Sequence, residues 1–310
     1  MVYPEKKYKS NISLGQSSNR LTILVAINLI VFVIFAFIKT LYFFRYADKN
    51  TAITFYHENV LNWFALPADG KEILARPWTI LTQMFLHERL WQVVPNMLWL
   101  GLFGSILQTL TGNRKLIPVF IYGGLAGALA FILAFNFLPG LKAGLSESYL
   151  SGASAGIMAI AIVTTTISPG YRIFPMLNGG IPLWIITAMF LVIDLATIPV
   201  NNPGGHITHL AGSFMGFLFI FFLRKGYDWS NWMNNFFEWI SNLFNPDKPR
   251  KGKEFKKQLF YKSGSPPYKK YINITQQRID EILDKINQQG YEFLTEEEKD
   301  MLKQASKEDI

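Results

Sequence analysis

Two short segments contain the residue types that hydrolysis of a peptide bond needs. Ser154 stands in the string Gly-Ala-Ser-Ala-Gly, and His209 begins the string His-Leu-Ala-Gly-Ser-Phe-Met-Gly. Each string lies at the start of an apolar stretch long enough to cross a bilayer. A serine and a histidine at membrane depth cost free energy, so residues of this kind mark functional sites. The pair therefore predicts a nucleophile and its general base, held inside a membrane protein.

The composition of the chain agrees with a membrane location. Half of the 310 residues are hydrophobic and 15% are aromatic, which excludes an ordinary soluble domain. A helix needs about 20 predominantly apolar residues to cross the hydrocarbon core. The sequence therefore predicts an all-α membrane protein with a six-transmembrane-helix bundle. The six stretches that meet this length approximately are 21–44, 90–110, 116–138, 149–167, 178–198 and 206–223.

The charged residues of the loops predict the orientation. Lysine and arginine at 6–20, 114–115, 172 and 224–225 all fall on one side, whereas the opposite loops carry balanced charge or almost none. By the positive-inside rule both termini are cytoplasmic. We expect a multi-pass protein of a bacterial inner membrane, with Ser154 and His209 about one helical turn below the outer face.

Several kinds of chemistry are excluded by the residues that the chain lacks. There is no cysteine, so a disulfide, a thiol nucleophile and a thiolate metal site cannot form. The four histidines contain no His-Glu-x-x-His motif, and the spans contain no cluster of carboxylates. We therefore expect no metal and no cofactor. Asp194, the one acid within a span, is interpreted as a hydrogen-bonded structural acid or, alternatively, as part of a proton relay.

The chain divides into five predicted parts. Aromatic and apolar residues recur at helical spacing after the last span, which is typical of an amphipathic helix lying in the membrane interface. The next segment holds nine lysines and arginines and one acid between 248 and 270, which favours anionic lipid over nucleic acid, with a merely solvated linker as the alternative. The parts are a cytoplasmic segment 1–20, a six-span domain 21–226, an interfacial helix 227–247, a basic proline-containing linker 248–272 and a two-helix module 273–310. We expect the lipid contact within 229–270 and no nucleic acid.

The order and spacing of these motifs resemble the rhomboid intramembrane serine proteases over about residues 21–226. The strongest matches are the Gly-x-Ser motif of Gly152 and Ser154 and the His-x-x-Gly-x-x-x-Gly motif of His209, Gly212 and Gly216. Supporting matches are Phe-Leu-His ending at His87, Asn-Met-Leu-Trp-Leu beginning at Asn96, Gly104, and Gly112 before the basic pair Arg114-Lys115.

The resemblance implies a role for each matching residue. Ser154 would attack the scissile carbonyl, and His209 would take its proton and later return it to the leaving amine. The oxyanion would be stabilised by the Ser154 backbone amide and by the side chains of Asn96 and Gln92. Gly152, Gly212, Gly216 and His87 would be structural supports. The substrates implied are transmembrane proteins, cut in or near their membrane segments.

The chain departs from the family pattern at several positions. Gln92 stands where histidine is usual, and Thr79 follows Trp78 where arginine is common. The other departures are Ala155, Met158 and Gln108. One alternative function is therefore a rhomboid-like protein that binds membrane proteins without cutting them. A transporter or channel is a further alternative, although the spans lack the paired charges and the inverted repeat that such proteins show.

Overall fold

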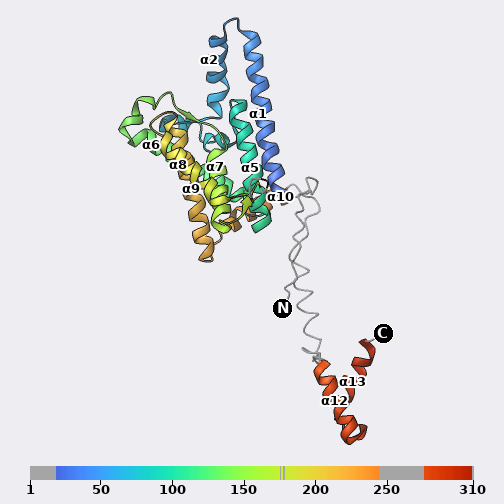
Figure 1. Cartoon of the computed structure of the whole chain (residues 1–310). Coiled ribbons are helices and arrows are strands. Elements are labelled where there is room, and N and C mark those ends of the chain that lie inside the picture. The colour runs from blue at the N-terminus through green and yellow to red at the C-terminus, as the bar shows by residue number, and fades with distance from the viewer. Residues whose placement is uncertain (1–18, 175, 177–178, 244–275, 309–310) are drawn as a thin grey trace. The chain divides into compact units, whose positions relative to one another are not determined.

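The chain folds into helices connected by short loops, as the computed structural model in Figure 1 shows for residues 19–174, 176, 179–243 and 276–308. Four helices are long and apolar enough to cross a membrane: α1 (Arg20–Arg45), α5 (Leu90–Thr111), α6 (Leu116–Phe137) and α9 (Pro203–Arg224). Two shorter apolar helices are α7 (Ser154–Ile167) and α8 (Leu183–Thr197). These six helices fall on the six expected stretches. Because α7 and α8 have only 14 and 15 residues, the crossing of the membrane by all six remains a prediction.

The fourth and fifth stretches were predicted too long. They were expected to begin at 149 and 178, but α7 begins at Ser154 and α8 at Leu183. The apolar residues before each helix instead form short antiparallel strands. Their backbone N–H and C=O groups therefore bond a neighbouring strand and not the next turn of a helix. β2 (Tyr149–Leu150) pairs with β1 (Leu66–Pro67), and β4 (Ile181–Pro182) pairs with β3 (Arg172–Ile173).

The centre of the bundle is α7, which packs against α5, α6 and α9. Every residue from 155 to 161 is buried. Close packing depends on glycines, because a Cβ atom at Gly216 would lie 2.5 Å from the Ala159 carbonyl oxygen, and one at Gly212 would overlap the Ala155 carbonyl. The two glycines therefore allow α9 to approach the first half of α7, where Ser154 lies.

The connection between α1 and α5 forms a compact structure of short elements. Helix α2 folds back beside α1 (Figure 1), and the strand pair β1–β2 joins this connection to the segment that leads into α7. Arg76 donates from Nη1 to the Asn62 carbonyl at 2.5 Å and forms an ion pair with Glu72. Arg76 thus links Asn62 and Glu72 within this connection. Position 79, where arginine is common in the family that the sequence resembles, is threonine in this protein. The elements are α2 (Lys49–Asn59), η1 (Leu61–Trp63), α3 (Gly70–Ala75), α4 (Thr79–Thr82), η2 (Gln83–Phe85) and, between α6 and β2, η3 (Pro139–Gly144).

Helix α10 (Ser230–Leu243) and the two residues before it contact the N-terminal ends of α1 and α6 through polar groups, including a hydrogen bond between Arg20 and Asn234. Lys115 forms an ion pair with Asp228 at 2.7 Å, and the Tyr122 hydroxyl donates to the Trp229 carbonyl at 2.9 Å. Asp228 also accepts from the Ser230 backbone N–H at 3.0 Å and so caps the start of α10. Trp232, Phe236 and Trp239 of α10 are exposed, and the Trp232 indole N–H also donates to the Tyr122 hydroxyl of α6. The insertion of α10 into the membrane interface remains a prediction.

The C-terminal unit contains α12 (Gln276–Gln289), η4 (Tyr291–Phe293) and α13 (Glu296–Glu308), around a small core of Ile282, Leu294 and Met301. Thr295 and Glu298 form a capping box at the start of α13, because the Thr295 N–H donates to the Glu298 carboxylate at 2.8 Å and the Glu298 N–H donates to Thr295 Oγ1 at 3.3 Å. The basic linker predicted at 248–272 lies outside the described residues.

Candidate active site

A cavity of about 640 Å³ brings together the predicted nucleophile, base and oxyanion donors. Gln92 and Asn96 line it from the first turns of α5, and Ser154 lines it from the start of α7. His209 lines it from α9. Four residues that the sequence scatters over three helices therefore meet around one space.

Ser154 is the first residue of α7, immediately after a sharp turn. Gly152 has a φ of 127°, a conformation that residues with a Cβ rarely adopt. Its N–H donates to the Gln83 carbonyl at 2.8 Å, and an added Cβ would lie 2.8 Å from Gln92 Nε2. The turn thus needs glycine, and it places Ser154 where the N–H groups of the first helical turn lack intrahelical acceptors.

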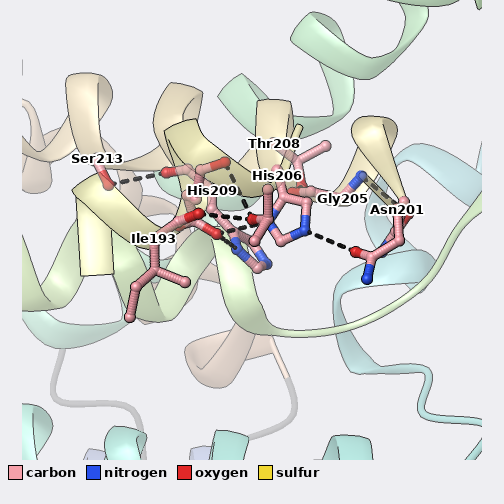
Figure 2. A network of polar contacts seen from close by, with 10 residues as sticks. Ile193, Asn201, Gly205, His206, Thr208, His209 and Ser213 are labelled. Atoms are coloured by element: carbon pink, nitrogen blue, oxygen red, sulfur yellow. Dashed lines mark hydrogen bonds and ion pairs between the residues drawn. The ribbon is translucent and has the colours of Figure 1, made fainter. Parts of the chain in front are cut away.

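His209 is oriented by the carboxylate of Asp194. His209 Nδ1 lies 2.9 Å from Asp194 Oδ1, and the Asp194 side chain is only 9% exposed. In a neutral ring whose Nδ1 donates this hydrogen bond, Nε2 has a free lone pair and can accept a proton. The same Asp194 oxygen lies 2.8 Å from His206 Nδ1. Figure 2 shows the two histidine rings close together, with a contact from His206 to Asn201.

Sequence reasoning did not identify Asp194 as the partner of His209. A usable signal was present, because Asp194 lies in the last turn of α8 and His209 in the second turn of α9. Two helices joined by a short loop bring the end of the first beside the start of the second. An acid one turn before such a loop and a histidine soon after it are therefore expected to meet.

The side chains proposed to bind the oxyanion, Gln92 and Asn96, are each held in place by a hydrogen bond from the amide nitrogen. Gln92 Nε2 donates to the Ser151 carbonyl at 2.8 Å, and Asn96 Nδ2 lies 3.0 Å from His87 Nε2. Burial lowers the pKa of His87 to about 4, so its ring is neutral and Nε2 accepts from Asn96. A carboxamide nitrogen carries two hydrogens, which leaves one on each side chain for a substrate oxygen.

Ser154 and His209 share no hydrogen bond within the described part of the chain, although both side chains line the same cavity. Catalytic hydrogen bonds are often long before substrate binds and shorten in the complex. The geometry therefore places the pair within one site without forming the proton-transfer bond.

A further polar cluster at the cavity escaped the sequence analysis. Glu88, which lines the cavity, accepts from the Tyr149 hydroxyl at 3.1 Å and from Ser151 Oγ at 3.2 Å, with His57 Nε2 at 3.8 Å. Burial, followed by the charge of Glu88, raises the pKa of Tyr149. The phenol therefore stays protonated and holds the carboxylate. No pattern in the sequence joins residues this far apart.

One group of side chains in the described residues has metal-binding chemistry. The ligand atoms of Asp194, His206 and His209 all lie within 4.8 Å of one another. No metal was expected from the sequence, because these ligands come from two helices and form no contiguous motif.

Comparison with known proteins agrees with the fold. Residues 74–226 match the rhomboid domain family, and residues 268–308 match a family of unknown function, DUF6576. The chain is 22% identical over 182 residues to rhomboid protease GlpG of Pectobacterium atrosepticum, covering 53% of this chain and 54% of that protein. It is 27% identical over 145 residues to rhomboid-like protein 17, chloroplastic, of Arabidopsis thaliana, covering 44% of each. The chain thus spans about half the length of these curated relatives.

Proposed function

The chain carries a rhomboid domain at residues 74–226 and is an integral membrane protein, and from this we propose that it is an intramembrane serine endopeptidase. Its substrates are membrane proteins, cut in or near their transmembrane segments. The observation that carries the proposal is the shared cavity of Ser154 and His209, together with the Asp194 carboxylate 2.9 Å from His209 Nδ1.

In the proposed reaction Ser154 Oγ attacks the scissile carbonyl carbon. His209 Nε2 takes the serine proton and gives it to the leaving amine, and water then repeats the sequence on the acyl-enzyme. Asp194 acts as a positioning residue. By accepting from Nδ1–H it keeps the Nε2 lone pair available and stabilises the imidazolium that forms.

The negative charge that develops on the carbonyl oxygen needs donors that are already in place. The free amide hydrogens of Gln92 and Asn96 and the Ser154 N–H are the proposed donors. Gln92 replaces the histidine usual at this position without loss of a donor, although it cannot carry a charge.

The orientation proposed for the protein has both termini in the cytoplasm of a bacterium and the cavity open toward the outer face. The loop charges support this orientation by the positive-inside rule. The exposed aromatic face of α10 and the basic segment 248–270 are proposed to contact anionic lipid on the cytoplasmic side.

The proposal is tested by labelling the purified protein with a fluorophosphonate and by following cleavage of a single-span membrane protein. Ser154→Ala and His209→Ala should each abolish both signals while the protein still folds. The double variant should be no worse than either, because members of one catalytic unit are not additive. Ser151→Ala is the matched control, since its hydroxyl also lies in the cavity but bonds Glu88, and it should still be labelled.

The results also separate the proposal from its main rival, a rhomboid-like protein that binds membrane proteins without cutting them. Binding of the single-span protein by the wild-type chain without labelling or cleavage would support that rival and refute the protease.

A further inference from the structure

We propose that Asp194, His206 and His209 form a binding site for one divalent transition-metal cation of the zinc type, and that occupancy of this site switches the enzyme off. The binding site stands on its own geometry, whereas its inhibitory effect rests on the proposed function. The site lies between the last turn of α8 and the first two turns of α9.

The three ligand atoms converge on one point. Asp194 Oδ1 lies 2.8 Å from His206 Nδ1 and 2.9 Å from His209 Nδ1, and all three atoms are within 4.8 Å of one another. The histidines are three positions apart on one helix, so they project from the same face. Two imidazole nitrogens and one carboxylate oxygen suit zinc and neighbouring first-row metals, whereas magnesium and calcium prefer oxygen ligands alone.

The hydrogen-bond partners of His206 are compatible with a ligand at Nδ1. Nδ1 faces Asp194 Oδ1, and on the other side of the ring Nε2 lies 3.3 Å from Asn201 Oδ1. The Thr197 hydroxyl, 3.2 Å from Nδ1, already donates to the Ile193 carbonyl. Both ring nitrogens therefore face acceptors, and a neutral imidazole can donate from only one of them. A metal on Nδ1 resolves this, because the ring proton then sits on Nε2 and donates to Asn201.

The two distances from Asp194 need only a small adjustment to accept the cation, whereas the histidine nitrogens, which lie within 4.8 Å of each other, would also have to come to the tetrahedral separation. Zinc lies about 2.0–2.2 Å from nitrogen and oxygen ligands, so in a tetrahedral site the ligand atoms are about 3.3 Å apart. Separation of the Asp194 and histidine atoms by about half an ångström, through rotation of the side chains, is enough for the two distances from Asp194. The Asn201 oxygen would hold His206 from outside, as acceptors beside metal-bound histidines do. The side chains of His206 and His209 are 17% and 26% exposed, and His209 lines the cavity, so the cation has a route in.

Metal binding would remove the base from the reaction. With the cation on Nδ1, the neutral His209 ring carries its one proton on Nε2, the nitrogen that must accept the Ser154 proton. The residue that orients the base in the free enzyme thus becomes a ligand that locks it in the wrong tautomer. Because the metal acts on the nitrogen that accepts the proton during the reaction, it should lower kcat more than it raises KM.

Binding is measured first, by calorimetric titration of the full chain in detergent with zinc chloride. Ser154→Ala is the background, because it separates binding from turnover. One zinc per chain is expected, with no heat from magnesium chloride. Adding Asp194→Asn or His206→Ala should weaken zinc binding about tenfold or more, whereas His57→Ala, a histidine beside a single carboxylate, should leave it unchanged. Unaltered zinc binding in both ligand variants, or no binding at all, would overturn the site.

Inhibition is then measured as cleavage of a single-span membrane protein in zinc buffers, with each variant compared with its own rate in chelator. The wild-type rate should fall with zinc and return when chelator is added, and His206→Ala should need about ten times more zinc. Equal zinc sensitivity of wild type and His206→Ala would refute the inhibitory role. Zinc binding without any cleavage by the wild type would instead refute the protease function and support the metal site. Cleavage without zinc binding would refute the metal site and support the protease function.

Discussion

Asn96 and His87 are held together by a 3.0 Å hydrogen bond from the amide nitrogen to an imidazole nitrogen. The bond requires a neutral His87 ring, because an imidazolium ion has no lone pair to accept with. His87 is 1% exposed, and its Nδ1 lies 3.3 Å from the Phe85 carbonyl. The loop before α5 thus positions one of the two side chains proposed to bind the oxyanion.

The first prediction is a loss of stability in mild acid. The folded pKa of His87 is about 4, below its ordinary value of 6.5, so the unfolded chain takes up the proton first. Stability should be fully present above pH 6.5 and fall by about 3 kcal/mol as the pH drops to about 4. Melting temperatures in detergent across this range measure the effect. His87→Gln keeps an acceptor for Asn96 and should flatten the pH dependence; an unchanged slope would show that His87 is not the group responsible.

The second prediction concerns Gln92. If its free amide hydrogen binds the oxyanion, Gln92→Ala should lower kcat about a hundredfold, or ~3 kcal/mol, with a smaller change in KM. Gln92→His should keep partial activity because an imidazole N–H can donate. Gln92→Glu should be at least as damaging as alanine, since a carboxylate repels both the oxyanion and the Ser151 carbonyl. Asn96→Ala gives the comparison, and wild-type turnover in both Gln92→Ala and Gln92→Glu would place Gln92 outside the oxyanion site.

The third prediction concerns the approach of α9 to α7. In Gly212→Ala the new methyl group would overlap the Ala155 carbonyl one residue after Ser154, so the helices must separate. We expect a loss of about 1–3 kcal/mol of stability and a lower kcat. Gly101→Ala is the matched control, because a Cβ there has no neighbour within 4 Å and alanine favours the helix. A melting temperature for Gly212→Ala equal to that of Gly101→Ala would contradict the packing argument.

The fourth prediction concerns Asp194. Asp194→Asn, assayed in chelator, should lower kcat about a hundredfold with little change in KM, because the His209 ring loses the group that fixes its orientation and tautomer. Asp194→Glu should recover part of the rate, since a carboxylate remains within reach. If Asp194→Asn lowered only the melting temperature and left kcat intact, Asp194 would be a structural acid, as the sequence first suggested.

The sequence singled out those candidate site residues whose local surroundings are distinctive, and their roles remain a prediction. Ser154 and His209 were found because each stands among glycines and alanines at the start of an apolar stretch. Gln92 and Asn96 were assigned by resemblance, and the structure places both around the same cavity. The helices themselves were equally predictable, since a long apolar stretch in a membrane has few ways other than an α-helix to satisfy its backbone hydrogen bonds.

What the sequence could not supply was pairing between distant segments. The strands before α7 and α8 are two residues long, too short for any period to show. The contact of Asp194 with His209 depends on the turn at Asn202, whose φ of 39° is unusual for a residue other than glycine. The contact of Arg76 with the Asn62 carbonyl likewise depends on how the connection between α1 and α5 folds back on itself.

The unequal lengths of the helices have a consequence for the surrounding lipid. At 1.5 Å per residue, the 26 residues of α1 extend about 39 Å, whereas the 15 residues of α8 extend about 22 Å. The outward face of α8 is apolar, with Met189, Val192 and Leu195 more than half exposed. If α8 crosses the membrane as predicted, a hydrocarbon layer of about 30 Å has to become thinner along α8 than along α1, since hydrophobic mismatch is relieved by local thinning. The protein would then be surrounded by an asymmetric annulus of lipid, thinnest beside the helix that supplies Asp194.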